Sequence, residues 1–289
     1  MATHDYRVTN YGYIHSHKEE DFNVFLKTID PKDGDVILDA FCGYGETTQK
    51  LIAQENAEKI SCTHYLSDAS ETQVKRAVAV LGDELSVKSI EVADARDLPY
   101  DDEMFDIVVV KMGFHEVSKE MQEKIMKEIF RVLKTGGKFV TWEIALSDDT
   151  EVQKVFRDVI YRKNELAGFY EINRSRYFQT EKGLLELFQK TGFSKHEKVH
   201  DIRYLFESIR RREELVSVET KMITDAKGIL GETEQKFLTK LAEYRLQEFN
   251  KSIREIIGNE SLKQKVSFKE TSIDNLSFLA NKAIFYAVK

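Results

Sequence analysis

The sequence predicts an α/β fold with a parallel sheet and one helical insertion. Short β-branched runs alternate with helical patterns through the first half of the 289 residues, and this alternation is typical of βαβ units. Hydrophobic residues make up 42% of the chain, which is enough for a sizeable core and too much for a disordered protein. Only Pro31 and Pro99 are prolines and no Gly/Ser-rich linker occurs, so no flexible domain boundary is indicated.

Five strands and three helices are expected in the first half. Residues 121–133 have a helical pattern, because Ile125, Ile129 and Val132 recur at amphipathic spacing. The glycine pair 136–137 ends this helix, since glycine tolerates the left-handed turn that follows a helix. The expected strands are residues 36–39, 59–65, 88–92, 105–110 and 138–144, and the expected helices are residues 47–54, 71–81 and 121–133.

The second half is predicted to be mainly helical. Two helices, residues 152–166 and 181–191, precede a strand at 193–204, and Gly192 is the expected C-cap of the second helix. A last strand is expected at 282–288. Between these two strands lie helical patterns at residues 206–227 and 232–257. We therefore divide the chain into an N-terminal cap segment with a helix (1–33), a sheet domain (34–204), a helical insertion (205–280) and a final strand (281–289).

Composition excludes several classes of protein. With 43 basic and 50 acidic side chains the formal charge is −7, which argues against a protein that grips long nucleic acid. Cys42 and Cys62 are too few for a disulfide framework and lack CxxC spacing, so we expect no metal site. No apolar run approaches the roughly 20 residues that span a bilayer, and we expect a cytoplasmic protein with no membrane span.

A glycine-containing turn follows the first strand. The strand ends at Asp39, Gly43 and Gly45 lie in the turn, and a helix begins directly afterwards. Glycines let a backbone approach a ligand closely, and a helix N-terminus offers free N–H groups, although such turns also occur without a ligand. The dinucleotide fingerprint needs a third glycine where Thr48 stands, which counts against a nicotinamide cofactor.

Polar residues also follow the later strands, where ligands bind in open parallel sheets. Asp68 follows the second strand and can accept hydrogen bonds from ribose hydroxyls, or can act as an ordinary N-cap. Asp94 and Ala95 close the third strand, where an acid can bind an adenine amino group; Asp97 competes for that role. His115 follows the fourth strand.

These segments together resemble the class I S-adenosylmethionine-dependent methyltransferases, closest to the small-molecule branch that includes quinone-ring methylating enzymes. The family pattern LDxGxGxG matches residues 38–45, with Phe41 in place of the first glycine. The pattern that begins with Asp68 and ends at Ala77 matches in type, and RVLKPGG matches residues 131–137 with Thr135 in place of proline. The resemblance implies a doubly wound, Rossmann-like sheet of seven strands with an antiparallel last strand.

The resemblance also implies S-adenosylmethionine as the cofactor. Asp39 and the backbone of Gly43 and Gly45 would bind its amino-acid moiety, Asp68 its ribose, and Asp94 with Ala95 its adenine. The full set of expected cofactor-binding residues is Asp39, Phe41, Gly43, Gly45, Asp68, Asp94, Ala95 and Lys111.

The methyl acceptor is expected beside the end of the fourth strand. His115 is the candidate general base, which would remove a proton from the acceptor, and a structural histidine is the competing interpretation. Arg174 and Arg176 could bind an anionic substrate or lie in a solvated loop. The expected substrate-binding residues are Tyr11, Tyr13, Phe114, His115, Arg174 and Arg176.

We therefore predict transfer of a methyl group, by in-line displacement, to an O, N or C atom of a small molecule. A methyltransferase of tRNA or protein, an NAD(P)-dependent oxidoreductase and a non-catalytic cofactor-binding module stay as alternatives. DNA is not an expected substrate, because the base-methylating branches carry a Pro-Pro-Tyr motif that this chain lacks. The helical insertion would cover the acceptor pocket, and its apolar positions would equally suit a homodimer interface.

Overall fold

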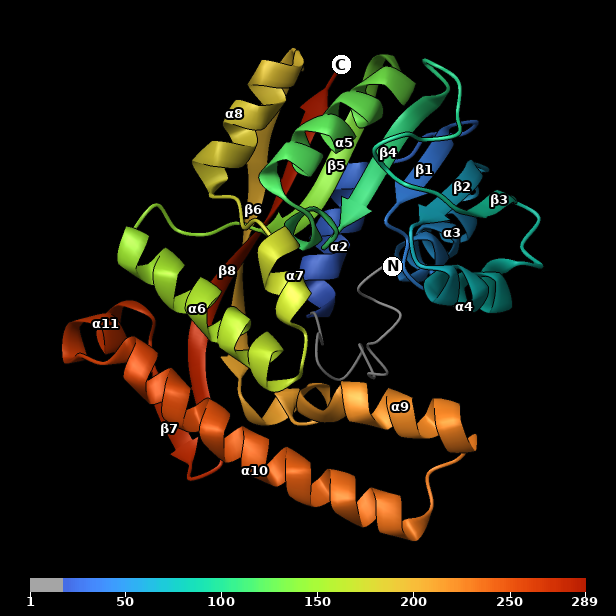
Figure 1. The fold of residues 1–289 in the computed structure, drawn as a ribbon. Helices are drawn as coiled ribbons and strands as arrows, with labels where there is room; N and C mark the ends of the chain where they lie inside the picture. Colours follow the sequence, from blue (N-terminus) through green and yellow to red (C-terminus); the bar gives the residue numbers. More distant parts are fainter. Residues whose placement is uncertain (1–17) are drawn as a thin grey trace.

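A mixed sheet forms the centre of the protein, whose computed structural model describes residues 18–289 (Figure 1). Seven strands form the path β3-β2-β1-β4-β5-β8-β6, and β7 pairs with β8 beside it. The strands are β1 (Val36–Ala40), β2 (Thr63–Asp68), β3 (Val87–Val92), β4 (Phe105–Lys111), β5 (Leu133–Ile144), β6 (Lys195–Glu207), β7 (Lys269–Ser272) and β8 (Asn275–Val288).

The direction of the strands confirms the predicted fold class. β1 to β5 pair in parallel, whereas β8 runs antiparallel to both of its main neighbours, β5 and β6. The last strand is therefore the reversed one, as the resemblance implied. The carboxyl ends of β1, β2 and β4 meet at one edge of the sheet, and this edge carries the glycine turn.

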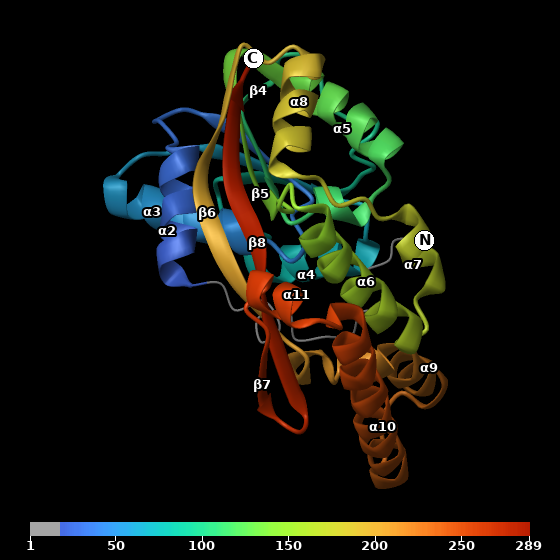
Figure 2. The same ribbon diagram turned by 90° about the vertical axis from the view of Figure 1, so that its left-hand side faces the viewer.

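Helices cover both faces of the sheet. Figure 2 shows α2 and α3 on one side and α5, α6 and α8 on the other. The helices are α2 (Glu19–Ile29), α3 (Glu46–Glu58), α4 (Glu71–Leu81), α5 (Lys119–Val132), α6 (Thr150–Leu166), α7 (Tyr170–Ser175), α8 (Glu181–Thr191), α9 (Ser217–Lys227), α10 (Glu232–Ile257) and α11 (Glu260–Lys265). Short 3-10 turns occur at η2 (Phe114–Glu116), η3 (Ile209–Arg211) and η4 (Glu214–Val216).

Aromatic side chains fill the core on each side of the sheet. Trp142 of β5 is fully buried and meets Phe22 and Phe25 of α2 edge to face, at centroid distances of 5.7 and 5.6 Å. On the opposite face Phe139 packs against Phe188 of α8 at 5.8 Å. Aromatic side chains therefore pack against β5 from both faces of the sheet, and this packing fixes the position of the strand ends.

Several predicted boundaries are wrong by a few residues. β2 begins at Thr63 rather than at residue 59, because α3 continues to Glu58 and Lys59 ends it in the left-handed conformation. β5 begins at Leu133 directly after α5, so the glycine pair 136–137 lies inside the strand and does not end the helix. The predicted bounds of α4, α8 and α10 and the C-cap at Gly192 are confirmed.

The predicted insertion is less separate from the sheet than expected. β6 and β8 pair continuously from Lys195 and Val288 to Glu207 and Ser277, so the boundaries predicted at 205 and 280 fall within paired strands. Residues 206–216 form the end of β6 and two 3-10 turns instead of an α-helix. This long two-stranded extension brings side chains of the predicted insertion toward the edge of the sheet.

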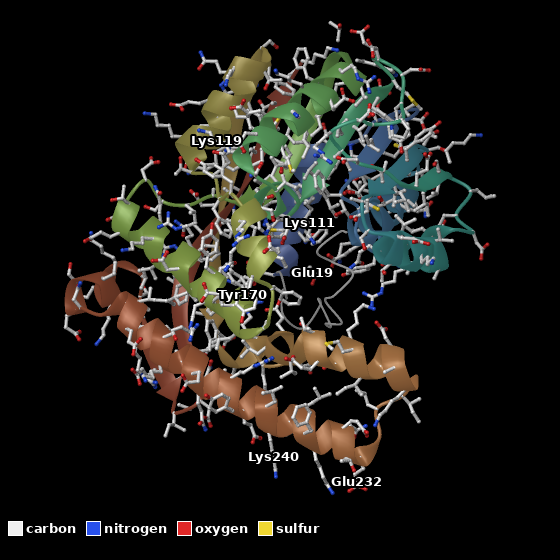
Figure 3. All side chains as sticks on the ribbon, in the orientation of Figure 1. Glu19, Lys111, Lys119, Tyr170, Glu232 and Lys240 are labelled. Atoms are coloured by element: carbon white, nitrogen blue, oxygen red, sulfur yellow. The ribbon has the colours of Figure 1, made fainter. Side chains whose placement is uncertain are left out.

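The rest of the predicted insertion packs beside α6 and β8. Phe249, Ile253 and Ile257 of α10 join Phe156 of α6 in one buried apolar cluster. The outer end of α10, marked by Glu232 and Lys240 in Figure 3, lies far from the sheet. Four large apolar side chains of α9, α10 and the loop between them are exposed: Met222, Ile229, Phe237 and Tyr244. Dimerisation through these helices stays a prediction. Among residues 18–289, no helix combines the length and apolarity needed to cross a membrane.

Candidate active site

One cavity of about 730 Å³ runs along the carboxyl edge of the sheet. Its first end, which we call the glycine-turn end, is lined by residues from 41–47, 68–73 and 92–96. Its second end, the β6–β8 end, is lined by Lys163, Tyr204, Phe206, Arg211, Glu214 and Lys282. His115 and Lys111 lie between the two ends, and Figure 3 shows Lys111 near the centre of the molecule. A ligand of two parts could therefore occupy both ends at once.

Asp68 connects the glycine turn to the end of β2. Its Oδ2 accepts a hydrogen bond from the backbone N–H of Gly43 at 3.0 Å, and its Oδ1 accepts one from Ser70 at 2.8 Å. The N-cap of α4 is Ser70, whose hydroxyl accepts from the N–H of Gln73, so the capping role considered for Asp68 is wrong. Asp68 lines the cavity while it fixes the shape of the turn.

Phe41 occupies the place of the family's first glycine and adopts a conformation that favours glycine. Its φ is +65°, in the left-handed region. A Cβ added at Gly113 would lie 2.5 Å from Cγ of Phe41, so only glycine leaves room there for this ring. At Gly43, by contrast, nothing lies within 4 Å of an added Cβ, so the turn leaves free space at this position. Gly45 does not line the cavity; a Cβ there would lie 2.6 Å from Leu81 in α4.

Asp39 is buried beneath the glycine turn and does not itself line the cavity. It is 2% exposed, and its Oδ2 accepts a hydrogen bond from the hydroxyl of Thr48 at 2.9 Å. Its Oδ1 has no hydrogen-bond partner among the described residues. Burial raises the pKa of Asp39 to about 7, against the opposing effects of Thr48 and Lys111. A cation beside Oδ1 would stabilise this carboxylate.

The outer part of the glycine-turn end carries Asp94 and Ala95. Asp94 is exposed and paired with Arg96, which lowers the pKa of Asp94. Ala95 is buried and lines the cavity beside them. Gln73 was missed by the sequence argument; it is 4% exposed, lines the cavity, and its Oε1 has no partner among the described residues.

Lys111 at the end of β4 is engaged by neighbouring groups. Its Nζ pairs with Glu46 of α3 at 2.6 Å and lies 5.2 Å from the centre of the Phe22 ring. The ion pair crosses from the fourth strand to the first helix after the glycine turn, and both side chains line the cavity.

His115 lies between two carboxylates. Its Nδ1 is 2.5 Å from Oε1 of Glu143, and its Nε2 is 3.3 Å from Oε1 of Glu116. Burial opposes a charge on the ring, but Glu143 and Glu116 outweigh burial and raise the pKa of His115. A protonated imidazole has no lone pair with which to accept a proton, so this environment favours a hydrogen-bond donor over a general base.

The other expected substrate residues lie in different surroundings. Arg176 is 7% exposed and forms a two-pronged ion pair with Glu116, so its assignment to a solvated loop is wrong. Arg174 is 79% exposed, pairs with Glu171 and does not line the cavity. Phe114 packs between the rings of Phe41 and Phe139 below the cavity surface. Tyr11 and Tyr13 lie outside the described residues.

Comparison with known proteins agrees with this geometry. Residues 37–137, from the first strand to the start of the fifth, match the family described as "Methyltransferase domain". This part of the chain is similar to a methyltransferase domain. The resemblance to the class I methyltransferases predicted from the sequence is confirmed, and the glycine turn lies inside the matched segment.

Relatives of the methyltransferase domain cover different shares of the chain. An uncharacterized methyltransferase of Geobacillus sp. is 26% identical over 63% of this chain and 82% of its own length. A demethylmenaquinone methyltransferase of Lactobacillus johnsonii is 33% identical, but over only 39% of this chain and 46% of its own length. The solved structure of protein BH2331 from Bacillus halodurans has the same fold, with a TM-score of 0.69, 17% identity, and coverage of 93% of this chain and 99% of that one.

The β6–β8 end lies outside the methyltransferase domain and was missed by the sequence argument. Lys163 of α6 pairs with Glu214 at 2.9 Å, and both side chains are buried. Arg211 is 3% exposed and donates a hydrogen bond to the hydroxyl of Tyr204. Lys282 is fully buried, 4.2 Å from the centre of the Tyr204 ring, and burial with help from nearby cations lowers the pKa of Lys282 to about 7.

One signal in the sequence could have indicated part of this end. Lys282 stands between Ala280 and Ile284, and alternation along a strand predicts that all three side chains share one face of the sheet, on which Lys282 is the only charged residue from 276 to 288. A lysine on a buried face is unusual and indicates a functional or paired group. The roles of Lys163 and Arg211 follow only from the tertiary fold.

Proposed function

We propose that the protein is an S-adenosylmethionine-dependent methyltransferase that acts on a small molecule. The observation that supports this most is the continuity of the cavity, which joins the glycine turn of the methyltransferase domain to a buried, polar and aromatic end. One end would bind the methyl donor, and the other would bind the acceptor.

The glycine-turn end has the groups that this cofactor requires. Asp39, buried beneath the turn, places a carboxylate close to where the ammonium group of an amino-acid moiety would bind, and the space at Gly43 admits the rest of that moiety close to the backbone. Asp68 and Gln73 have oxygens that can accept from ribose hydroxyls, and Ala95 gives an apolar contact for adenine. When bound, the cofactor would supply a methyl group on a positively charged sulfur, which is open to direct displacement.

The chain's own part in the reaction is alignment and exclusion of water. His115 would hold its proton between Glu143 at Nδ1 and Glu116 at Nε2, and an acceptor oxygen that replaced Glu116 would accept the hydrogen bond from Nε2. Glu116, fixed by Arg176, keeps the ring in place. Aligning an acceptor in a site that lacks water supplies much of the rate enhancement in displacements of this type.

The test is calorimetric titration with S-adenosylhomocysteine, with NADH as the control ligand. We expect micromolar binding of the first compound and none of the second. A protein that binds NADH, or that does not bind S-adenosylhomocysteine, would contradict the proposal.

A matched pair of glycine variants locates the binding. Gly43 and Gly34 both have a positive φ with open space around an added Cβ, but only Gly43 lines the cavity. Gly43→Leu and Gly34→Leu should each destabilise the fold by about 1–2 kcal/mol. Only Gly43→Leu should weaken binding of S-adenosylhomocysteine, by more than about tenfold, which corresponds to about 1.4 kcal/mol.

A further inference from the structure

We propose that the β6–β8 end of the cavity binds the carboxylate of an aromatic acid, and that the acceptor belongs to this chemical class. The identification of this ligand as the methyl acceptor rests on the proposed function. The binding site itself rests on the charges, donors and rings of the cavity wall.

Basic side chains outnumber acidic ones at this end. Among the described residues that line this end, three side chains are basic, Lys163, Arg211 and Lys282, and one is acidic, Glu214. All four are buried. A buried wall with more basic than acidic groups suits an anionic ligand better than a cationic one.

Arg211 has a hydrogen-bond donor available for such a ligand. Its Nε is buried and has no partner among residues 18–289. One terminal nitrogen donates to Tyr204, and the other lies 3.7 Å from Glu214, beyond normal hydrogen-bond distance. A guanidinium group binds carboxylates through its N–H donors, and the unpartnered Nε–H of Arg211 supplies one such donor.

Aromatic rings line the space between His115 and Arg211. Phe178 stacks on the imidazole at 5.8 Å with an interplanar angle of 15°, and Phe156 meets Phe178 edge to face at 5.4 Å. At the other side the guanidinium of Arg211 lies 4.9 Å from the centre of the Phe206 ring. A planar aromatic acid fits this arrangement: its ring would lie between the aromatic side chains, and its carboxylate would bind Arg211.

Two probes with the same naphthalene ring test the proposal: 2-naphthoate, which carries a carboxylate, and 2-naphthol, which carries a neutral hydroxyl group. Their affinities for the full chain are measured by calorimetry, with and without S-adenosylhomocysteine. We expect 2-naphthoate to bind at least about tenfold more tightly, since a hydrogen-bonded charge pair in a buried site typically contributes that much. Equal affinities for the two probes would overturn the proposal.

Three variants connect this preference to the site. Arg211→Gln should abolish the preference for 2-naphthoate, whereas Arg212→Gln, which removes the neighbouring and more exposed arginine, should retain it. Glu214→Gln removes a negative charge and should tighten binding of 2-naphthoate several-fold with no effect on 2-naphthol. A merely structural role would lower both affinities. If Arg211→Gln does not fold, Glu214→Gln decides, and an unchanged or lower affinity for 2-naphthoate overturns the proposal.

The two proposals fail separately in these measurements. A chain that prefers 2-naphthoate but does not bind S-adenosylhomocysteine would contradict the methyltransferase activity and support the acid site. A chain that binds S-adenosylhomocysteine but does not distinguish the two probes would contradict the acid site alone.

Discussion

The two ends of the cavity are built in different ways. At the glycine-turn end, backbone geometry fixes the shape: Gly43 and Ser70 donate N–H groups to Asp68, and Phe41 adopts a positive φ. At the β6–β8 end, ionic side chains from distant parts of the chain meet on two long strands and α6. The first end belongs to the matched domain and the second does not. In this protein the proposed donor site is thus local and backbone-based, whereas the proposed acceptor site is assembled by tertiary structure.

The largest expected effect comes from Arg176, which belongs to the middle of the cavity. Arg176→Gln removes the two-pronged ion pair of the buried Glu116, and breaking a buried pair in this way typically costs about 3–5 kcal/mol. Arg174→Gln is the control, because this arginine is exposed and such pairs contribute less than about 1 kcal/mol. Urea denaturation of both variants measures the difference. Equal losses of stability in the two variants would mean that the buried Arg176–Glu116 pair contributes no more to stability than the exposed Arg174–Glu171 pair.

Lys282 is expected to make stability depend on pH. Its pKa is about 7 in the folded chain and near 10.5 when unfolded, so the folded state binds fewer protons between these values. The stability of the wild type should therefore rise from pH 7 to pH 10.5, by up to about 5 kcal/mol from this group. Lys282→Met removes this rise, and its advantage over the wild type should be greatest below pH 7.

The exposed Lys240 on α10 is the matched control for Lys282 (Figure 3). Lys240→Met should leave the dependence of stability on pH unchanged. Denaturation of the wild type and both variants at pH 6, 8 and 10 gives the comparison. A Lys282→Met variant whose stability relative to wild type does not vary with pH would show that the lysine is charged throughout this range.

Asp39 makes the opposite contribution at the glycine-turn end. Its pKa rises from 3.8 to about 7 on folding, so its favourable contribution is complete below pH 3.8 and is lost as pH increases to 7. Asp39→Asn should therefore be more stable than the wild type at pH 8, and should bind S-adenosylhomocysteine more weakly because the ammonium group loses its anionic partner. Asp83→Asn, an exposed change away from the cavity, should alter neither property. A destabilised Asp39→Asn variant at pH 8 would contradict the burial argument.

The sequence predicted the glycine-turn end better than the β6–β8 end for a physical reason. Asp39, Gly43 and Asp68 stand at strand ends or in the turn, and such positions can be recognised from a few neighbouring residues. His115 was also located, but its protonation depends on Glu143, which β5 places beside it from 28 positions away. Lys163 and Glu214 are 51 positions apart, so no local pattern joins them. The assignment of residues 206–216 to a helix failed for the same reason, because pairing with β8 extends β6 to Glu207.

Phe41 and Gly113 allow a direct test of how the glycine-turn end accommodates its departure from the family pattern. A methyl group at Gly113 would lie 2.5 Å from Phe41, so Gly113→Ala should destabilise the protein by about 1–3 kcal/mol. The cost should fall when Phe41→Gly removes the ring, and the coupling between the two sites should be about 0.5–3 kcal/mol. Gly136→Ala is the control: its added Cβ meets nothing within 4 Å, so its cost should not depend on residue 41. Equal costs of Gly113→Ala with and without Phe41 would mean that the ring is not what requires a glycine at position 113. S-adenosylhomocysteine binding by the Phe41→Gly variant then tests the turn itself, because a turn that needs the ring for its shape should bind more weakly without it.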